Sequence, residues 1–214
     1  MLEKLPPAVG HVLRDRRAGL EKIAFNRSGL RTGQGLLQVG SLAFADHAPI
    51  PARYTADGPG VSPPLHWQGV PAEAESLVLI VEDADAPTGE PLVHAIVVGL
   101  PGADGSLHEG ALDSPGHEGE DVHEGRNSYF RTGWLPPDPP PGHGQHRYVF
   151  QLFALGPGED FGKTPGRDDV IQAIQQRAIA SGMVTGTYER PDGARPPTAG
   201  GRRRAARSTG KSGA

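Results

Sequence analysis

The sequence predicts a mainly β domain with a sandwich architecture, and three observations support that prediction. Apolar segments of strand length lie at 76–82 (SLVLIVE), 92–100 (LVHAIVVGL) and 147–155 (RYVFQLFAL). The connections between them are rich in turn residues, because the chain of 214 residues contains 31 glycines and 22 prolines. Helical spacing is confined to two stretches. Many short strands joined by Gly- and Pro-rich turns are typical of β-sandwiches.

The first half of the chain contains one predicted helix followed by strands. Within the first 25 or so residues, apolar side chains share one helical face, namely Val9, Val12, Leu13, Leu20 and Ile23. This helix is expected to pack on the core or on a second copy of the chain in a homodimer. Residues 36–44 alternate as a strand does, and 45–71 are rich in turn residues. The continuously apolar segments 76–82 and 92–100 predict strands that are buried on both faces.

The second half begins with an acidic loop and returns to strands. Residues 103–125 contain seven acidic residues, three histidines and neither Lys nor Arg, which predicts a long polar loop. The segment 147–155 predicts a third strong strand. Residues 168–181 have apolar side chains at helical spacing, acids at the start and Gly182 at the end, which predicts a helix. A last short strand is expected at 183–188.

Composition and charge limit the classes of function. The chain has no cysteine, which excludes disulfides, thiolate catalysis and Cys-ligated metal. Apolar runs are too short to span a bilayer, and the charged N-terminus does not fit a signal peptide, so a soluble, cytoplasmic protein is expected. Residues 194–214 hold six basic residues and no acidic ones. They predict a disordered basic tail able to contact anionic lipid or nucleic acid, although a solubilising tail is the simpler interpretation.

Polar side chains cluster at the ends of the three strong strands. Asp83 and Asp85 follow the first strand and are two residues apart, so they project to the same side of an extended chain. His94 interrupts the second strand, where a buried ring needs a hydrogen-bond partner. His146 and Tyr148 share one face at the start of the third strand. The sequence by itself leaves open whether these strand ends meet.

Three ordered motifs give the chain a resemblance to a known family. They are EDADAP (82–87) with LVHAIVVGLP (92–101), then PPPGHGQHRYVFQLFAL (139–155), and upstream YTADGPGVSPPLHWQGVP (54–71). Together with GTYER (186–190), this pattern resembles the phosphatidylethanolamine-binding protein family, in particular its bacterial Raf kinase inhibitor-like branch (YbhB/YbcL type). The resemblance covers about residues 36–190. It divides the chain into an N-terminal helical extension (1–30), the family domain (31–193) and the basic tail (194–214).

The resemblance implies a fold, a pocket and a class of function. The fold is a β-sandwich with a large antiparallel sheet, a smaller sheet and a few short helices. The pocket binds phosphate-like groups, including phospholipid headgroups, without a metal or cofactor, and its members in this chain are Asp83, Asp85, His94, Pro139, Pro140, His146 and Tyr148. A histidinium donates charge-assisted hydrogen bonds to phosphate oxygens, and nearby carboxylates can pair with the ammonium of an ethanolamine headgroup.

The chain departs from the family pattern at several positions around that pocket. Ala84 stands where proline is usual, and Ala95 replaces an aromatic residue after His94. Where the family has glycines before the double proline, this chain has Pro136, Pro137 and Asp138. Prolines offer no N–H to an anion, and an added acid weakens anion binding. His143 occupies a variable position of the motif and is predicted to face solvent, which leaves His146 as the ligand-binding histidine of the two.

Three hypotheses about function follow. The first is non-enzymatic binding of a phosphate-bearing or other small anionic ligand, with regulation of a partner kinase or protease. The second is a hydrolase that uses the Asp/His cluster for acid–base catalysis or to hold a metal. The third is a protein-interaction module with a vestigial pocket, acting through the N-terminal helix and the basic tail.

Overall fold

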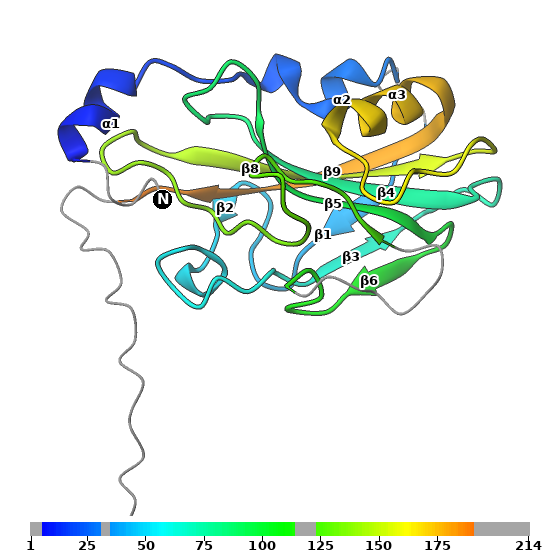
Figure 1. The fold of residues 1–214 in the computed structure, drawn as a ribbon. Helices are drawn as coiled ribbons and strands as arrows, with labels where there is room; N and C mark the ends of the chain where they lie inside the picture. The colour runs from blue at the N-terminus through cyan, green and yellow to red at the C-terminus, as the bar shows by residue number, and fades with distance from the viewer. Residues whose placement is uncertain (1–5, 31–34, 114–122, 191–214) are drawn as a thin grey trace, which may run out of the picture.

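A computed structural model describes residues 6–30, 35–113 and 123–190. Two β-sheets lie face to face, and the helices cover the outer face of the larger sheet (Figure 1). The mainly β sandwich with few short helices that the sequence predicted is therefore confirmed. The basic tail predicted at 194–214 lies outside the described residues, as does 114–122 of the predicted acidic loop.

Four strands and one helix have eight or more residues, and the other elements are shorter. The strands are β1 (Gln38–Gly40), β2 (Ala48–Pro49), β3 (Leu65–Gln68), β4 (Ser76–Asp83), β5 (Leu92–Pro101), β6 (Gly105–Leu107), β7 (His123–Glu124), β8 (His146–Leu155) and β9 (Ala178–Tyr188). The helices are α1 (Pro7–Leu13), α2 (Ala24–Arg27) and α3 (Arg167–Arg177), with 3-10 turns η2 (Leu20–Lys22) and η3 (Ala52–Tyr54).

The larger sheet has the order β2-β9-β8-β4-β5-β7, and the smaller sheet has the order β1-β3-β6. All neighbouring pairs are antiparallel except the edge pair of β2 with β9, which is parallel. The three strands predicted as strongest, β4, β5 and β8, are central and adjacent. Their apolar residues are buried on both faces, as their continuous hydrophobic runs indicated.

Two hydrophobic clusters explain why these strands are apolar on both sides. The cluster between the sheets contains Trp67, Leu79, Phe150 and their neighbours. The cluster on the other face contains Ile80 and Phe153, which pack against α2 and α3. Burial of this apolar surface is the main stabilising contribution to the fold.

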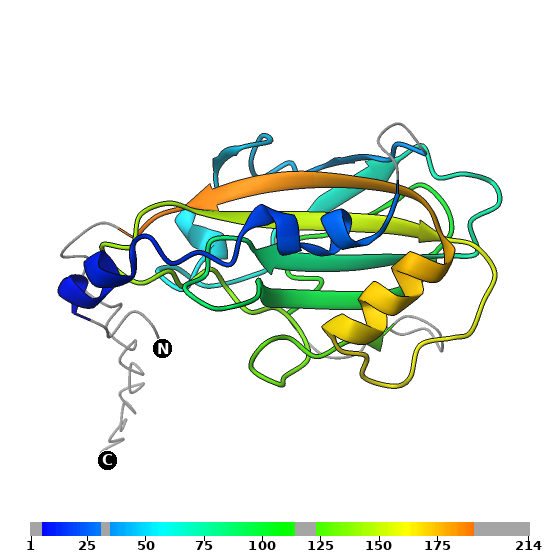
Figure 2. The same cartoon turned by 90° about the horizontal axis from the view of Figure 1, so that it is seen from above.

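The N-terminal region differs from the single amphipathic helix that was predicted. An extended stretch separates α1 from η2 and α2. It runs along the turn after β4, where Ala18 N donates to Ala86 O and Gly19 N donates to Ala84 O. Figure 2 shows this segment crossing the outer face of the large sheet, with α1 beyond its end. The backbone bonds to another chain segment prevent the helix from continuing through residues 14–19.

Other boundaries also differ from the prediction. The predicted helix at 168–181 ends at Arg177, because Ala178 already pairs with Leu155 and β9 is therefore longer than expected. The predicted strand at 36–44 is limited to β1, and an isolated bridge joins Leu36 to Ser181. The turn-rich 45–71 segment contains the short strands β2 and β3, and the predicted acidic loop contains β6 and β7.

Candidate functional site

The strand order brings the polar strand ends together. Strand β4 lies between β8 and β5 and runs antiparallel to both, so its last residue lies beside the first residues of its two neighbours. In register, Asp83 pairs with Tyr148 on one side and with Leu92 on the other. The side chains of Asp83, His94 and His146 therefore meet at one end of the large sheet.

Asp83 and His146 are buried and joined by a hydrogen bond. The Oδ2 atom of Asp83 lies 2.7 Å from Nδ1 of His146, and the side chains are only 6% and 1% exposed. The other carboxylate oxygen of Asp83 accepts the backbone N–H of Asp85 at 2.8 Å. Asp83 thus orients the His146 ring, much as a buried carboxylate orients a catalytic or metal-binding histidine.

His94 presents a bare nitrogen at the same place. Its Nδ1 donates to the backbone carbonyl of Leu135 at 2.5 Å, while its buried Nε2 has no hydrogen-bond partner among the described residues. Burial lowers the pKa of His94, although the charge of Asp83 opposes this shift. The ring is therefore neutral at neutral pH, and its Nε2 is a hydrogen-bond acceptor.

A small cavity of about 20 Å³ lies between these side chains. Its lining residues are Asp83, Ala86, Pro87, Leu92, His94, Tyr129, Leu135, Pro136, Asp138, Pro139 and His146. The walls are mostly apolar and the cavity holds about one water-sized group. Four of the seven residues predicted for the pocket line it, namely Asp83, His94, Pro139 and His146.

Asp85 belongs to a different environment. Arg147 binds its carboxylate through Nε at 2.7 Å and Nη2 at 2.7 Å, and Arg17 lies 3.0 Å from it. Burial alone would raise the pKa of Asp85, but hydrogen bonds from Arg147 and Arg17 lower it. The carboxylate lines a separate hollow beside these arginines and does not face the small cavity.

Tyr148 and Pro140 are buried next to the cavity without lining it. Tyr148 is fully buried and packs edge-on against His94, with ring centroids 5.1 Å apart at 87°. Its hydroxyl has no hydrogen-bond partner in the described part of the chain, and burial raises its pKa well above the usual value. Tyr148 therefore supports the His94 ring from behind.

The prediction that His143 faces solvent is wrong. His143 is fully buried, and its Nδ1 lies 2.6 Å from Nε2 of His146. Gly142 and Gly144 adopt positive φ angles of 78° and 93°, so the chain turns back and places the His143 ring beneath His146. The two histidines are a pair, and neither nitrogen of His146 is bare.

Asp138 pairs with a buried arginine side chain that no sequence pattern had indicated. Arg190, at the end of the GTYER motif, is 2% exposed and donates through Nη1 to Asp138 Oδ1 at 2.7 Å and to Pro139 O at 2.9 Å. Its Nε binds Asp57. The acid introduced before the double proline is thus neutralised locally. Tyr129 and Leu135 are further cavity residues that no sequence pattern had indicated.

The described residues contain no cluster of three or more His, Cys, Asp or Glu side chains suited to hold a metal.

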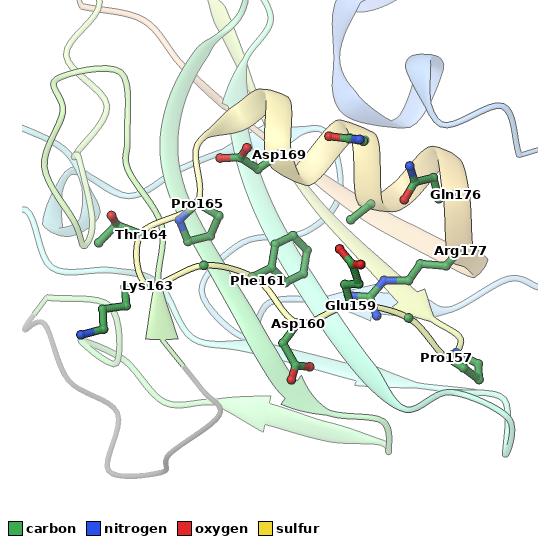
Figure 3. Close-up of a pocket in the computed structure, with 14 residues that line it drawn as sticks. Pro157, Glu159, Asp160, Phe161, Lys163, Thr164, Pro165, Asp169, Gln176 and Arg177 are labelled. Carbon is green, nitrogen blue, oxygen red and sulfur yellow. The ribbon is translucent and has the colours of Figure 1, made fainter.

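A much larger cavity, of about 570 Å³, lies elsewhere, between the 157–165 loop and α3. Figure 3 shows its polar lining, in which the Arg177 guanidinium lies 5.6 Å from the centre of the Phe161 ring. It shares no residue with the site at the strand ends, so cavity size does not identify the functional site in this chain.

No helix in the ranges that the structure describes is long and apolar enough to cross a bilayer. One similar protein is LppC of Mycobacterium tuberculosis, which its name calls a candidate lipoprotein. It is 39% identical over 155 residues, 72% of either chain. The cytoplasmic location therefore stays a prediction.

Other comparisons agree on the family. A UPF0098 protein of Methanothermobacter thermautotrophicus is 37% identical over 148 residues, which are 69% of this chain and 95% of that protein. The crystal structure of E. coli YbcL, described as a new member of the mammalian PEBP family, matches with a TM-score of 0.66 and 27% identity over 72% of this chain and 98% of that one. The sequence profile named phosphatidylethanolamine-binding protein matches residues 40–189. This chain therefore belongs to the phosphatidylethanolamine-binding protein family.

Proposed function

We propose that this protein binds, without catalysing a reaction, a small ligand that carries a phosphate group, either a free phosphate ester or a phospholipid headgroup. The observation that supports this proposal is the bare Nε2 of His94 at the cavity between Asp83 and His146. Leaving a buried polar atom without a partner costs about 1–3 kcal/mol, and a ligand that supplies the partner recovers that free energy.

The neutral state of His94 determines which form of the ligand binds. An acceptor nitrogen cannot bind a fully ionised phosphate oxygen, so the complex needs a proton between the two atoms. A phosphate monoester has its second pKa near 6 and carries that proton readily. A phosphodiester, such as a phospholipid headgroup, has no proton to lose in this range, so its binding requires the proton to be on Nε2 of His94. Whether the proton stays on the ligand or moves to Nε2, a charge-assisted hydrogen bond forms. Binding is therefore expected to strengthen as the pH falls from 8 to 6.

The size and polarity of the cavity suit one phosphate oxygen rather than a whole ligand. The cavity holds about 20 Å³, and Tyr129 at its edge is 38% exposed, so the rest of the ligand would extend past this ring. The carboxylates of Asp83 and Asp138 also line the cavity, so the ammonium group of a ligand would find acidic side chains there, although His146 and Arg190 already pair with them. An ethanolamine phosphate combines both groups.

Calorimetric titration with inorganic phosphate and O-phosphoethanolamine at pH 6 and pH 8 tests the proposal. We expect binding at pH 6, weaker binding at pH 8, and a preference for the ligand with the ammonium group. The variant His94→Asn retains a donor for Leu135 O and removes the bare nitrogen, so it should lose at least tenfold in affinity. His108→Ala, at an exposed side chain, is the control. No binding by wild-type protein at pH 6 would contradict the proposal.

Two further predictions stay untested. The family resemblance predicts regulation of a partner kinase or protease, and the N-terminal sequence predicts assembly as a homodimer. Regulation would be supported if this protein captures a kinase or protease in a pull-down only when phosphate is present. Sedimentation measurements over a range of protein concentrations would decide the second.

A further inference from the structure

A continuous hydrogen-bonded chain leads from the cavity to the N-terminal segment. Asp83 Oδ2 lies 2.7 Å from His146 Nδ1, and His146 Nε2 lies 2.6 Å from His143 Nδ1. His143 Nε2 then lies 2.8 Å from the carbonyl oxygen of Leu13 and 3.1 Å from that of Arg16. Asp83, His143 and His146 are all buried, and Asp83 is the most exposed of these residues at 5% of its whole surface.

The three hydrogen bonds that connect Asp83 to the Leu13 carbonyl need one proton more than two neutral imidazoles supply. A carbonyl oxygen cannot donate, so His143 Nε2 must carry a proton, and each of the other two links needs one as well. Three protons on one carboxylate and two rings would make the group neutral overall. Consecutive hydrogen bonds of this kind polarise one another, which strengthens the connection between Asp83 and the N-terminal segment.

Residues 6–19, here called the N-terminal strap, also contact both loops that shape the cavity. On the turn after β4, Ala18 N donates to Ala86 O at 2.9 Å, and Ala86 lines the cavity. On the bend before β8, Arg17 Nη1 donates to Gln145 O at 2.8 Å. The strap thus connects the two segments that carry Asp83 and His146.

The fit of the strap against the bend depends on Gly10. A Cβ atom at this position would lie 1.9 Å from the carbonyl oxygen of Pro141 and 3.0 Å from His143 N. Only a glycine allows α1 to approach the bend this closely. The strap lies wholly before residue 40, where the match to the family profile begins. It therefore lies outside the part of the chain that matches the family profile.

We propose that the N-terminal strap is part of the ligand site and that His143 is its positioning residue, so that strap docking and ligand affinity are coupled. This inference rests on the proposed function, since it concerns the affinity of the same cavity. With the strap docked, His143 fixes the His146 ring and both cavity loops are held. With the strap released, the bend and the turn lose this link, and ligand affinity falls. By thermodynamic reciprocity, ligand binding must favour the docked strap by the same factor.

Gly10→Ala tests this coupling without changing any cavity residue. We expect it to release the strap, seen as at least tenfold faster trypsin cleavage at Arg14, Arg16 or Arg17 by mass spectrometry. It should also weaken phosphate binding about tenfold, which is within the usual range of coupling between two sites. Val12→Ala changes an 84% exposed side chain on the same helix and should alter neither property. Saturating phosphate should slow cleavage of the wild-type strap by a similar factor.

A second pair of variants separates positioning from simple stability. His143→Ala should release the strap and weaken phosphate binding. His143→Asn keeps an acceptor near the Nδ1 position for His146 but loses the donor to Leu13 O, so it should recover part of the affinity while the strap remains sensitive to trypsin. Histidine ¹⁵N NMR of the wild-type protein should show His143 protonated at Nε2 and a shared proton between the two rings.

The two proposals fail by different results. If wild-type protein shows no response to phosphate at pH 6, the proposed function is wrong. If wild-type protein binds phosphate and Gly10→Ala releases the strap yet binds phosphate with unchanged affinity, the coupling is wrong and the proposed function stands. Equal trypsin sensitivity of the strap in Gly10→Ala and wild type would also overturn the inference, because the close contact with Pro141 would then not hold it.

Discussion

Arg147 Nε lies 2.7 Å from Asp85 Oδ2, and this pair holds the second aspartate of the 82–87 motif away from the cavity. The backbone N–H of Arg147 binds the same oxygen at 2.9 Å, so the carboxylate joins the turn after β4 to the start of β8. The two aspartates of the motif therefore have different roles: Asp83 faces the histidines, and Asp85 holds two segments of the fold together.

Asp85→Asn is expected to destabilise the fold by about 2 kcal/mol, because two guanidinium groups lose a buried partner. The pKa of Asp85 is lowered in the folded state, so its contribution is present above about pH 4 and is lost as the pH falls further. Urea unfolding at pH 7 and pH 3 measures both effects. A variant as acid-sensitive as wild type would contradict this assignment.

Glu124 should make the protein less stable as the pH rises. Both of its carboxylate oxygens are buried without a hydrogen-bond partner in the described ranges, and burial raises its pKa to about 7. A raised carboxyl pKa contributes stability that is full below about pH 4.5 and is lost as the pH rises to about 7. Glu124→Gln should flatten the change in unfolding free energy between pH 5 and pH 8. Glu159→Gln, at an exposed loop position, should leave that change as in wild type.

The fully buried Glu82 depends on Arg167 for its charge balance. Arg167 Nε lies 2.6 Å from Glu82 Oε1, while Glu82 Oε2 accepts from Ala24 N and Gln151 Nε2. Arg167→Met should destabilise the fold by about 3 kcal/mol, because it leaves a buried carboxylate without its cation. The double variant with Glu82→Gln should recover part of that loss, and chemical denaturation of the single and double variants measures the coupling. Simple additivity of the two changes would be inconsistent with this account.

Phe130 is expected to be a point of backbone strain. Its φ angle is 58° and its side chain is 85% exposed, so no packing within the described residues compensates for the left-handed conformation. Phe130→Gly should stabilise the protein by up to about 1 kcal/mol, because glycine adopts this conformation freely. Phe130→Ala keeps the strain and serves as the control. Calorimetry should show a higher melting temperature for the glycine variant alone, and equal melting temperatures for the two variants would rule out strain at this position.

Several features of the molecule were predictable from residue patterns alone. The long apolar runs of β4, β5 and β8 indicated strands buried on both faces, because only a strand covered on each side can be apolar at every position. The pattern left open whether the strand ends meet. The resemblance to the family implied one pocket for Asp83, His94 and His146, and the structure brings these three side chains together. A helix was predicted at 168–181 from its spacing and its acidic first turn, and the structure contains one at Arg167–Arg177.

Tertiary structure decided the remainder. His143 was expected in solvent, but two left-handed glycines turn its ring under His146. The strap was expected as one helix, yet its backbone N–H groups bind carbonyls of a turn about 70 residues away. Local patterns record which residues prefer burial or helix, whereas these contacts depend on partners that are distant in sequence, so only the folded chain determines which backbone and ring nitrogens meet.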